Sequence, residues 1–173
     1  MDEATSWITE EMRGLIGRPF NQARSYPVSA SDIRKWAIAV YYPDPPPAHY
    51  YDEDAAGTGV HGGIVAPEDF NPFAWLSAEP GMAARRGTFD PDWLEHRFGI
   101  AGPGLATNLN AGLNTTYGPR IRPGDVISSK SQVVSYAEKQ GRMGRMLITV
   151  IRTVWINQDG TTVKTVDQTA IRY

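Results

Sequence analysis

The sequence predicts an α+β fold in which one antiparallel sheet packs against a small number of helices. Residues 29–40 repeat apolar side chains at helical spacing, and the glycine pair at 62–63 is followed by an apolar-rich stretch. From residue 105 onward, apolar and polar residues alternate with a period of two, which is typical of half-buried strands. Because the helical patterns come first and the strands follow, we expect a sheet wrapped around one long apolar helix.

Two helices are expected in the N-terminal quarter of the chain. Residues 6–17 ("SWITEEMRGLIG") begin at a Ser/Thr cap and end at a glycine. Residues 29–40 ("SASDIRKWAIAV") have Ser29 or Ser31 as the cap and stop before Pro43, because the residue before a proline disfavours the helical conformation. This second helix should pack inward through Ile33, Trp36, Ala37 and Val40.

A third helix, buried in the core, is expected over residues 64–76, where Pro67 fits the first turn. Before it, the acidic run at 52–54 should form the solvated cap of a short helix. After it, residues 80–104 are rich in glycine, proline and charge, which predicts a long loop with one helical turn at 90–98. We expect this loop to shape the entrance of a ligand pocket.

Four strands should follow and pair in sequence as a meander. They cover residues 105–117, 126–140, 145–156 and 161–173, and the turn "NQDG" joins the last two as a hairpin. The third is rich enough in β-branched residues to be central. One face of the first strand should be buried: Leu105, Leu109, Ala111, Leu113 and Tyr117.

Composition favours one ordinary globular domain over residues 1–173, since 41% of the residues are hydrophobic and 21% are charged. The chain has no cysteine, which excludes disulfides and thiolate metal sites, and no spacing of histidines and acids predicts another metal site. The acidic N-terminal residues and the lack of a long apolar run favour a cytoplasmic protein with no membrane span.

Charge is unevenly spread along the chain. Residues 118–173 hold nine basic and four acidic residues, a net +5, while the rest of the chain carries −7. Such a basic segment could hold a phosphorylated ligand, or it could be the solvated face of strands. The basic residues are not interleaved with aromatic residues in a way that would favour nucleic acid.

The strongest chemical signal is "YYPDPPPAHYYDEDAA" at residues 41–56, where Asp44 and His49 bracket three prolines. The two side chains could be an acid/base pair or polar residues on a turn. Polyproline geometry, roughly 3.1 Å per residue, would hold them about 15 Å apart, so the loop must bend near residues 47–48 for both to reach one water. The other two histidines are interpreted as structural, His61 at the glycine turn and His96 in the long loop.

These residues resemble the signature of the MaoC-like, or (R)-specific, enoyl-CoA hydratases, which have a hotdog fold. Residues 63–67 are similar to the start of the family's helix, and 122–125 ("RPGD") to the turn before its strands. The segments "GLIGRPF", "SDIRKWAIA" and "GGIVAPEDF" are most similar to the FAS1-like dehydratase, or MaoC N-terminal, branch, to which steroid side-chain hydratase subunits belong. Four signature positions match: Asp44, Pro47, His49 and Ala55.

The chain also departs from that signature. Pro43 stands where the family has glycine, Pro46 where it has asparagine, and Ala48 where it has a larger aliphatic residue. An alignment anchored on "YYDEDAA" would place Tyr50 at the histidine position. Many members of this branch lack the histidine and act as silent partners of an active subunit.

The resemblance implies hydration of a trans-2-enoyl thioester, with coenzyme A as part of the substrate and no resident cofactor. His49 would exchange the proton, Asp44 would hold the water, and a backbone N–H of Gly62 or Gly63 at the helix start would stabilise the enolate oxygen. A lone hotdog leaves a sheet edge exposed, so we expect a homodimer or a heteromer with another MaoC-like chain. The candidate contacts to the CoA phosphates are Arg120, Arg122, Lys130, Arg142 and Arg145.

Two other functions stay open at this point. A non-catalytic hotdog subunit could shape the acyl pocket for an active partner, and the proline replacements favour this alternative. A hotdog thioesterase would need a carboxylate on or beside the central helix, which Glu68 or Asp69 could supply.

Overall fold

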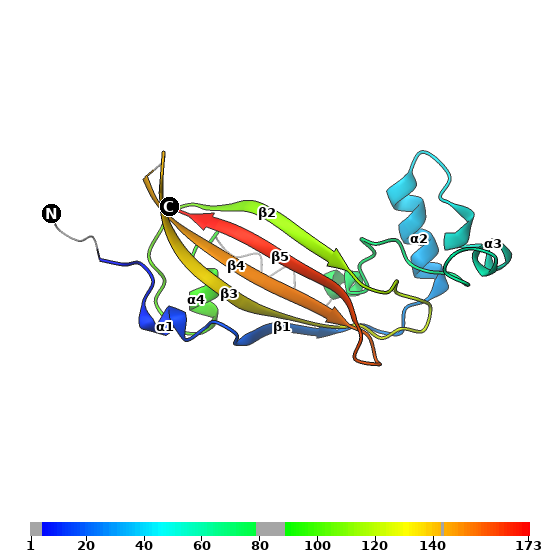
Figure 1. The fold of residues 1–173 in the computed structure, drawn as a ribbon, viewed down its shortest axis with the longest axis horizontal. Coiled ribbons are helices and arrows are strands. Elements are labelled where there is room, and N and C mark those ends of the chain that lie inside the picture. The colour runs from blue at the N-terminus through cyan, green and yellow to red at the C-terminus, as the bar shows by residue number, and fades with distance from the viewer. Residues whose placement is uncertain (1–4, 79–88, 143) are drawn as a thin grey trace.

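The structure, a computed structural model, describes residues 5–78, 89–142 and 144–173. Its described strands form a five-stranded antiparallel sheet in the order β1-β3-β4-β5-β2 (Figure 1). The expected α+β class is confirmed. The strands are β1 (Pro19–Arg24), β2 (Asn108–Tyr117), β3 (Ser128–Gly141), β4 (Gly144–Ile156) and β5 (Thr162–Arg172).

The four expected strands are all present, and β3, β4 and β5 form the expected meander. The predicted position of β2, next to β3 in a meander, was wrong. In the structure β2 pairs with β5 at one edge of the sheet. The opposite edge is β1, which pairs with β3. The sequence did not predict β1, because "PFNQAR" has no regular alternation of apolar and polar residues.

The first two helices and the short acidic helix each begin directly after a capping residue. Thr9 accepts a hydrogen bond from the Met12 backbone N–H (3.1 Å), and Ser29 accepts one from Asp32 (3.0 Å). Asp52 caps the short helix in the same way. Such caps satisfy N–H groups that the first helical turn leaves unpaired. The described helices are α1 (Glu10–Arg13), α2 (Ala30–Tyr41), α3 (Glu53–Gly57) and α4 (Trp93–Arg97), with short 3-10 helices at Ala48–Tyr50 and Ala74–Ala78. The part of the chain that the structure describes contains no helix long and apolar enough to cross a membrane.

The buried helix expected over residues 64–76 does not form. Ile64, Val65 and Ala66 are buried as core residues, but the chain runs through turns before the 3-10 helix at Ala74–Ala78. Two prolines explain this, because Pro67 and Pro72 supply no backbone N–H and Pro72 disfavours a helical residue before it. In addition, the Ala66 N–H donates to the carbonyl of Ile121 (2.8 Å), outside any helix.

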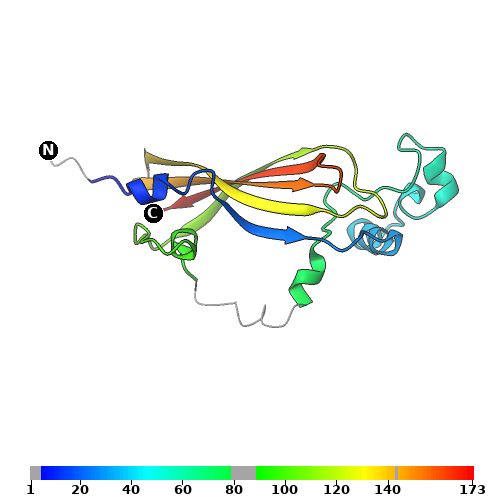
Figure 2. The ribbon, with the colours of Figure 1, turned by 90° about the horizontal axis from the view of Figure 1, so that it is seen from below.

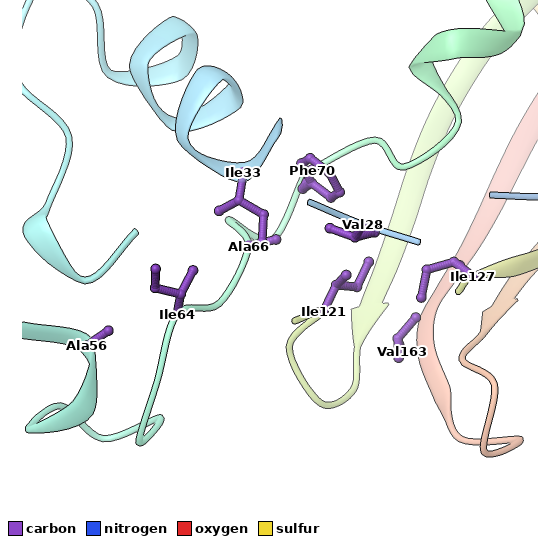
Figure 3. Packing of buried hydrophobic residues seen from close by; sticks show 9 residues of the cluster. All are labelled: Val28, Ile33, Ala56, Ile64, Ala66, Phe70, Ile121, Ile127 and Val163. Atoms are coloured by element: carbon purple, nitrogen blue, oxygen red, sulfur yellow. The ribbon is translucent and has the colours of Figure 1, made fainter. Parts of the chain in front are cut away.

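An apolar cluster joins α2, α3 and residues 64–70 to one end of the sheet (Figure 3). Ile33 comes from α2, Ala56 from α3, and Val163 from β5. Burying a valine, isoleucine or phenylalanine side chain contributes about 1.5–3 kcal/mol to folding. The cluster therefore fixes the end of the molecule where α2 and α3 project beyond the strands (Figure 1). Its members are Val28, Ile33, Ala56, Ile64, Ala66, Phe70, Ile121, Ile127 and Val163.

A buried ionic cluster attaches α4 to the sheet at the opposite end (Figure 1). The guanidinium of Arg172 donates to Asp92 (2.8 Å) and to both oxygens of Glu95 (2.7 and 2.9 Å). Glu95 is fully buried, and the Tyr136 hydroxyl donates to it (3.0 Å). Burial and the nearby Glu95 charge raise the pKa of Tyr136. These pairs satisfy charges that would otherwise be costly to bury.

Two further expectations are corrected by this arrangement. Leu109 and Leu113 on β2 are largely exposed, and the register shift between Asn110 and Gly112 places them on opposite faces of the sheet, so the expected single buried face does not form. Residues 89–104 carry α4 and lie at the end of the sheet opposite α2 and α3, so this part of the long loop does not shape a pocket near them (Figure 1). Residues 80–88 lie outside the described part. In Figure 2, α4 and the 3-10 helix at Ala74–Ala78 lie on the same side of the sheet.

Candidate functional site

A cavity of about 290 Å³ brings together two parts of the predicted site. His49 and Gly63 both line it, although fourteen positions separate them in the sequence. His61 lines it as well, and the rest of its wall is small residues and Val60 from residues 48–60. The cavity is therefore formed by the proline loop, α3 and the glycine turn.

The proline loop bends where the sequence analysis required it to bend. Pro47 precedes the single 3-10 turn at Ala48–Tyr50, which is closed by a hydrogen bond from the Tyr50 N–H to the Pro47 carbonyl (3.1 Å). The half-buried His49 ring then packs on the Tyr50 ring, with 4.1 Å between centroids. This local turn points His49 toward α3 instead of continuing the extended polyproline path.

Asp44 does not join His49 in this cavity. Asp44 is exposed and is not part of the cavity wall. Its backbone N–H donates to the Tyr41 carbonyl (2.9 Å) at the end of α2. The structure thus brings the imidazole and the glycine turn together and leaves the carboxylate on the surface.

The two glycines of the turn differ in their hydrogen bonding. The Gly62 N–H donates to the Gly59 carbonyl (3.1 Å), so it is already used. The Gly63 N–H has no acceptor among the described residues, which makes it the better candidate for an oxyanion donor. Gly62 has φ +62° and Gly63 has φ +154°, a region that favours glycine. Because no helix follows, a helix dipole does not add to this site.

Arg122 holds the glycine turn in place. Its Nη2 donates to the His61 carbonyl (2.5 Å), and its Nη1 lies 3.4 Å from where a Cβ on Gly63 would be. The Arg122 backbone N–H donates to Asp125 (2.7 Å), and Gln158 donates to the other oxygen of Asp125 (3.0 Å). The "RPGD" turn is therefore braced by the β4–β5 hairpin and in turn fixes the cavity wall.

The five basic candidates for the CoA phosphates do not form one patch. Arg120 pairs with Glu68 (2.8 Å) near the glycine turn, and Lys130 lies on β3. Arg142 and Arg145 belong to the β3–β4 hairpin, at the end of the sheet away from α2 and α3 (Figure 1). Arg145 is already bound to Glu138 through its Nε (3.1 Å) and Nη2. Of the five, Arg122 contacts the glycine turn of the cavity, and Arg120 lines a neighbouring hollow together with Tyr50.

Both carboxylates considered for a thioesterase are paired. Glu68 binds Arg120, and Asp69 accepts hydrogen bonds from the Tyr117 hydroxyl (2.6 Å) and the Lys164 ammonium (3.1 Å). The hydrogen bond from Tyr117 lowers the pKa of Asp69 most, and the one from Lys164 lowers it further. The hydrogen bond between Tyr117 and Asp69 also raises the pKa of Tyr117 to about 12. The arrangement ties residue 69 to β2 and β5 instead of presenting a free base.

His61 was expected only to support the glycine turn, but it also lines the cavity. Its position directly before Gly62 was the available signal in the sequence. The ranges that the structure describes contain no group of three acidic or histidine side chains that could hold a metal ion.

The five-stranded antiparallel sheet with few helices is a hotdog fold of the α+β class. The family described as "FAS1-like, dehydratase domain region" matches residues 14–166, and the chain belongs to this family. The resemblance found in the sequence is thereby confirmed. No match was found among curated proteins.

Solved structures support the fold. The ChsH1–ChsH2 complex from Mycobacterium tuberculosis matches with a TM-score of 0.65 and 21% identity, covering 90% of this chain and 84% of the other. A MaoC-like dehydratase from Rhodospirillum rubrum matches at 0.56 and 21%, covering 91% and 92%. The R-hydratase PhaJ1 from Pseudomonas aeruginosa matches at 0.50 and 16%, covering 91% and 81%. At these identities the similarity establishes the fold alone.

Proposed function

We propose that the protein is an (R)-specific enoyl-CoA hydratase, acting in the reverse direction as a 3-hydroxyacyl-thioester dehydratase. The observation that carries the proposal is that His49 and Gly63 line one cavity, and that the Gly63 N–H has no acceptor among the described residues. Membership of a dehydratase family supports it.

In the proposed reaction, water adds across the C2–C3 double bond of a trans-2-enoyl thioester. His49 takes a proton from the water as the oxygen bonds to C3, and the same imidazole returns a proton to C2 on the same face, giving the 3-hydroxyacyl product. Negative charge builds on the thioester oxygen, where the Gly63 N–H would stabilise it. One such donor is typically worth about 10²–10³ in rate.

Asp44 keeps its proposed role of holding the water only if the proline loop rearranges. Its side chain is on the surface of the isolated chain. Because Asp44 is exposed and outside the cavity wall, we expect Asp44→Asn to cost less activity than loss of His49.

The substrate's acyl carrier would lie along the glycine turn, where Arg120 and Arg122 are the basic residues near the cavity. Arg120 is half-buried and already neutralised by Glu68, which reduces its value for a phosphate. A comparison of CoA and carrier-protein thioesters would identify the carrier.

A second hotdog chain is the proposed partner. The edge strand β2 has outer backbone groups that face away from the sheet, and it exposes Leu109 (48%) on one face and Leu113 (62%) on the other. An edge strand with unpaired backbone groups pairs readily with another strand. Some structural neighbours are complexes of two subunits, such as ChsH1–ChsH2. The partner is therefore a second copy or a related chain.

The direct test is whether the purified protein hydrates crotonyl-CoA and a bulkier enoyl-CoA. Hydration is measured as the loss of absorbance of the conjugated double bond. His49→Ala should lower kcat by about 10²–10⁴, with an unchanged circular dichroism spectrum. Turnover by His49→Ala at the wild-type rate would exclude the assigned chemistry.

A non-catalytic subunit is the second candidate, and the exposed position of Asp44 favours it. In that case the purified chain should be inactive, and a complex with a related active chain should keep its activity when it carries His49→Ala. The two candidates give opposite results in the same pair of assays.

A further inference from the structure

The wall of the His49 cavity contains a second histidine, His61. Alanines, glycines and Val60 make up the rest of the wall, and none of their side chains can exchange a proton or form a hydrogen bond. His49 and His61 are therefore the two lining residues whose side chains can act on a polar ligand or on a bound water. They come from different segments, His49 from the proline loop and His61 from the glycine turn.

Neither imidazole is engaged elsewhere in the protein. His49 and His61 are both half-buried, and neither ring forms a hydrogen bond or an ion pair with any described residue. The third histidine differs, because the Nδ1 of His96 lies 2.8 Å from a carboxylate oxygen of Asp90. A polar side chain without a protein partner keeps its hydrogen-bonding capacity for water or for a ligand. Both histidines of the cavity are thus available to a substrate.

Both histidines are held by contacts outside the cavity. The His61 carbonyl accepts the hydrogen bond from Arg122, and two residues further on is the Gly63 N–H, which has no acceptor among the described residues. The His49 ring packs on Tyr50, with 4.1 Å between centroids. His61 therefore belongs to the same braced turn as the proposed oxyanion donor. A thioester whose oxygen bound the Gly63 N–H would have its reacting carbons in the cavity that both histidines line.

Hydration of an enoyl thioester needs two groups on the attacking water. One group takes a proton, and the other holds the remaining O–H so that a lone pair of the oxygen points at C3. The family resemblance gave the second role to Asp44, but this residue is exposed and is not part of the cavity wall. His61, in contrast, lies in the wall together with His49.

We propose that His61 holds the attacking water, in the role that the resemblance gave to Asp44. The inference rests on the proposed hydratase function and adds a second side chain to its chemistry. A neutral imidazole has one acceptor nitrogen, which takes a hydrogen bond from one O–H of the water while His49 removes the other proton. The oxygen bonds to C3, the proton on His49 passes to C2, and the hydrogen held by His61 stays on the oxygen of the 3-hydroxyl group. His61 keeps its protonation state throughout.

Two replacements at position 61 separate this role from a structural one. His61→Leu removes the acceptor, whereas His61→Gln offers an amide oxygen in its place. With crotonyl-CoA, His61→Leu should lower kcat about tenfold with little change in KM, and His61→Gln should recover most of that loss. Asp44→Asn should lose less than His61→Leu.

His96→Leu is the matched control, since His96 lies on α4 at the other end of the sheet and should keep the wild-type kcat (Figure 1). Circular dichroism spectra establish that each variant is folded. Equal losses in the two His61 variants, or no loss in His61→Leu, would overturn the inference and leave the proposed role of His49 intact.

A binding measurement separates this inference from the proposed reaction. It compares (R)-3-hydroxybutyryl-CoA, whose hydroxyl takes the place of the water, with butyryl-CoA, which lacks it. Calorimetric titration is carried out in the His49→Ala background, which stops any turnover by that imidazole and removes its own hydrogen bond. This background should bind the hydroxy thioester about three- to tenfold more tightly than butyryl-CoA. Adding His61→Leu should bring the ratio near one, and adding His61→Gln or His96→Leu should preserve it.

That pattern supports the role of His61 even where the wild type hydrates no enoyl thioester, in which case the proposed reaction alone fails. Equal binding of the two thioesters in the His49→Ala background, binding of neither, or a preference that survives His61→Leu overturns the inference, whether or not crotonyl-CoA is hydrated.

Discussion

The two ends of the sheet are built in different ways. At one end, α4 is attached through the buried charges of Arg172, Asp92 and Glu95. At the other end, α2 and α3 are attached through the apolar cluster and through single hydrogen bonds such as that of Arg122 to the His61 carbonyl. Buried ion pairs tolerate little displacement, because a separated charge stays unpaired in the interior. Apolar contacts and surface hydrogen bonds are easier to rearrange.

Both ends leave apolar side chains exposed. The α2–α3 end exposes Ile38, Val40, Tyr42 and Val60, and the α4 end exposes Phe89 and Trp93. Isolated apolar residues on a surface are ordinary, but Val60, 97% accessible, also lines the His49 cavity. The comparison teaches that the α4 end is a fixed anchor, while the α2–α3 end, which carries the His49 cavity, is easier to rearrange.

The largest effect on stability should come from removing the anchor. Arg172→Met leaves Glu95 and Asp92 buried without their cation, and should lower the free energy of unfolding by about 3–5 kcal/mol. Urea unfolding measures it. Arg13→Ala is the control, because Arg13 forms an exposed pair with Glu10 that should contribute little. Equal stability of the two variants would contradict the comparison.

Arg122→Ala should have the opposite profile, a small effect on unfolding and a loss of about tenfold in kcat, because the glycine turn loses its brace. The loss should be the same with crotonyl-CoA and with the phosphate-free N-acetylcysteamine thioester. Arg122→Lys should recover part of it, and Arg13→Ala should lose nothing. A loss confined to the CoA ester would instead make Arg122 a phosphate contact, as the sequence alone suggested.

The strands and caps could be predicted from the sequence because their signals are local. The alternation in residues 126–173 predicts three strands and their hairpins, and Thr9, Ser29 and Asp52 are recognisable caps. The strand β1 and the edge position of β2 depend on pairing between distant segments, which no local pattern encodes. The helix predicted over residues 64–76 does not form, because Pro67 and Pro72 disfavour a helix even though the segment is rich in apolar residues.

The candidate site was predicted only in part, for a similar reason. The resemblance brought His49 and Gly63 into one hypothesis, and the structure places both on one cavity. The orientation of Asp44 depends on how the chain leaves α2, which the proline run does not determine. The bond between Arg122 and the His61 carbonyl joins positions 61 residues apart, so a charge count could find the arginine but not its partner.

The edge strand allows a test of the partner surface. Leu113→Asp places a charge on an exposed position of the edge strand β2 and should weaken self-association, or association with a related chain, by at least tenfold. Analytical ultracentrifugation over a range of concentrations measures it. Ile16→Asp is the matched control, since Ile16 is also exposed (46%) but lies outside β2. Equal weakening by both variants would place the interface elsewhere.

The smallest effect should come from a surface pair at the anchor end. The hydrogen bond to Asp90 (2.8 Å) raises the pKa of His96, and the same bond lowers the pKa of Asp90. A raised histidine pKa stabilises the fold below its unfolded value, near pH 6.5, and this contribution is lost as the pH rises through the folded value. A lowered aspartate pKa stabilises the fold above about pH 3.9, and this contribution is lost as the pH falls through the folded value.

His96→Ala should therefore reduce Tm slightly at pH 5–6 and not at pH 9. A concentration of 1 M salt should remove the difference, because both side chains are exposed. A difference in Tm that persists at pH 9 would show that His96 stabilises α4 through packing instead of charge.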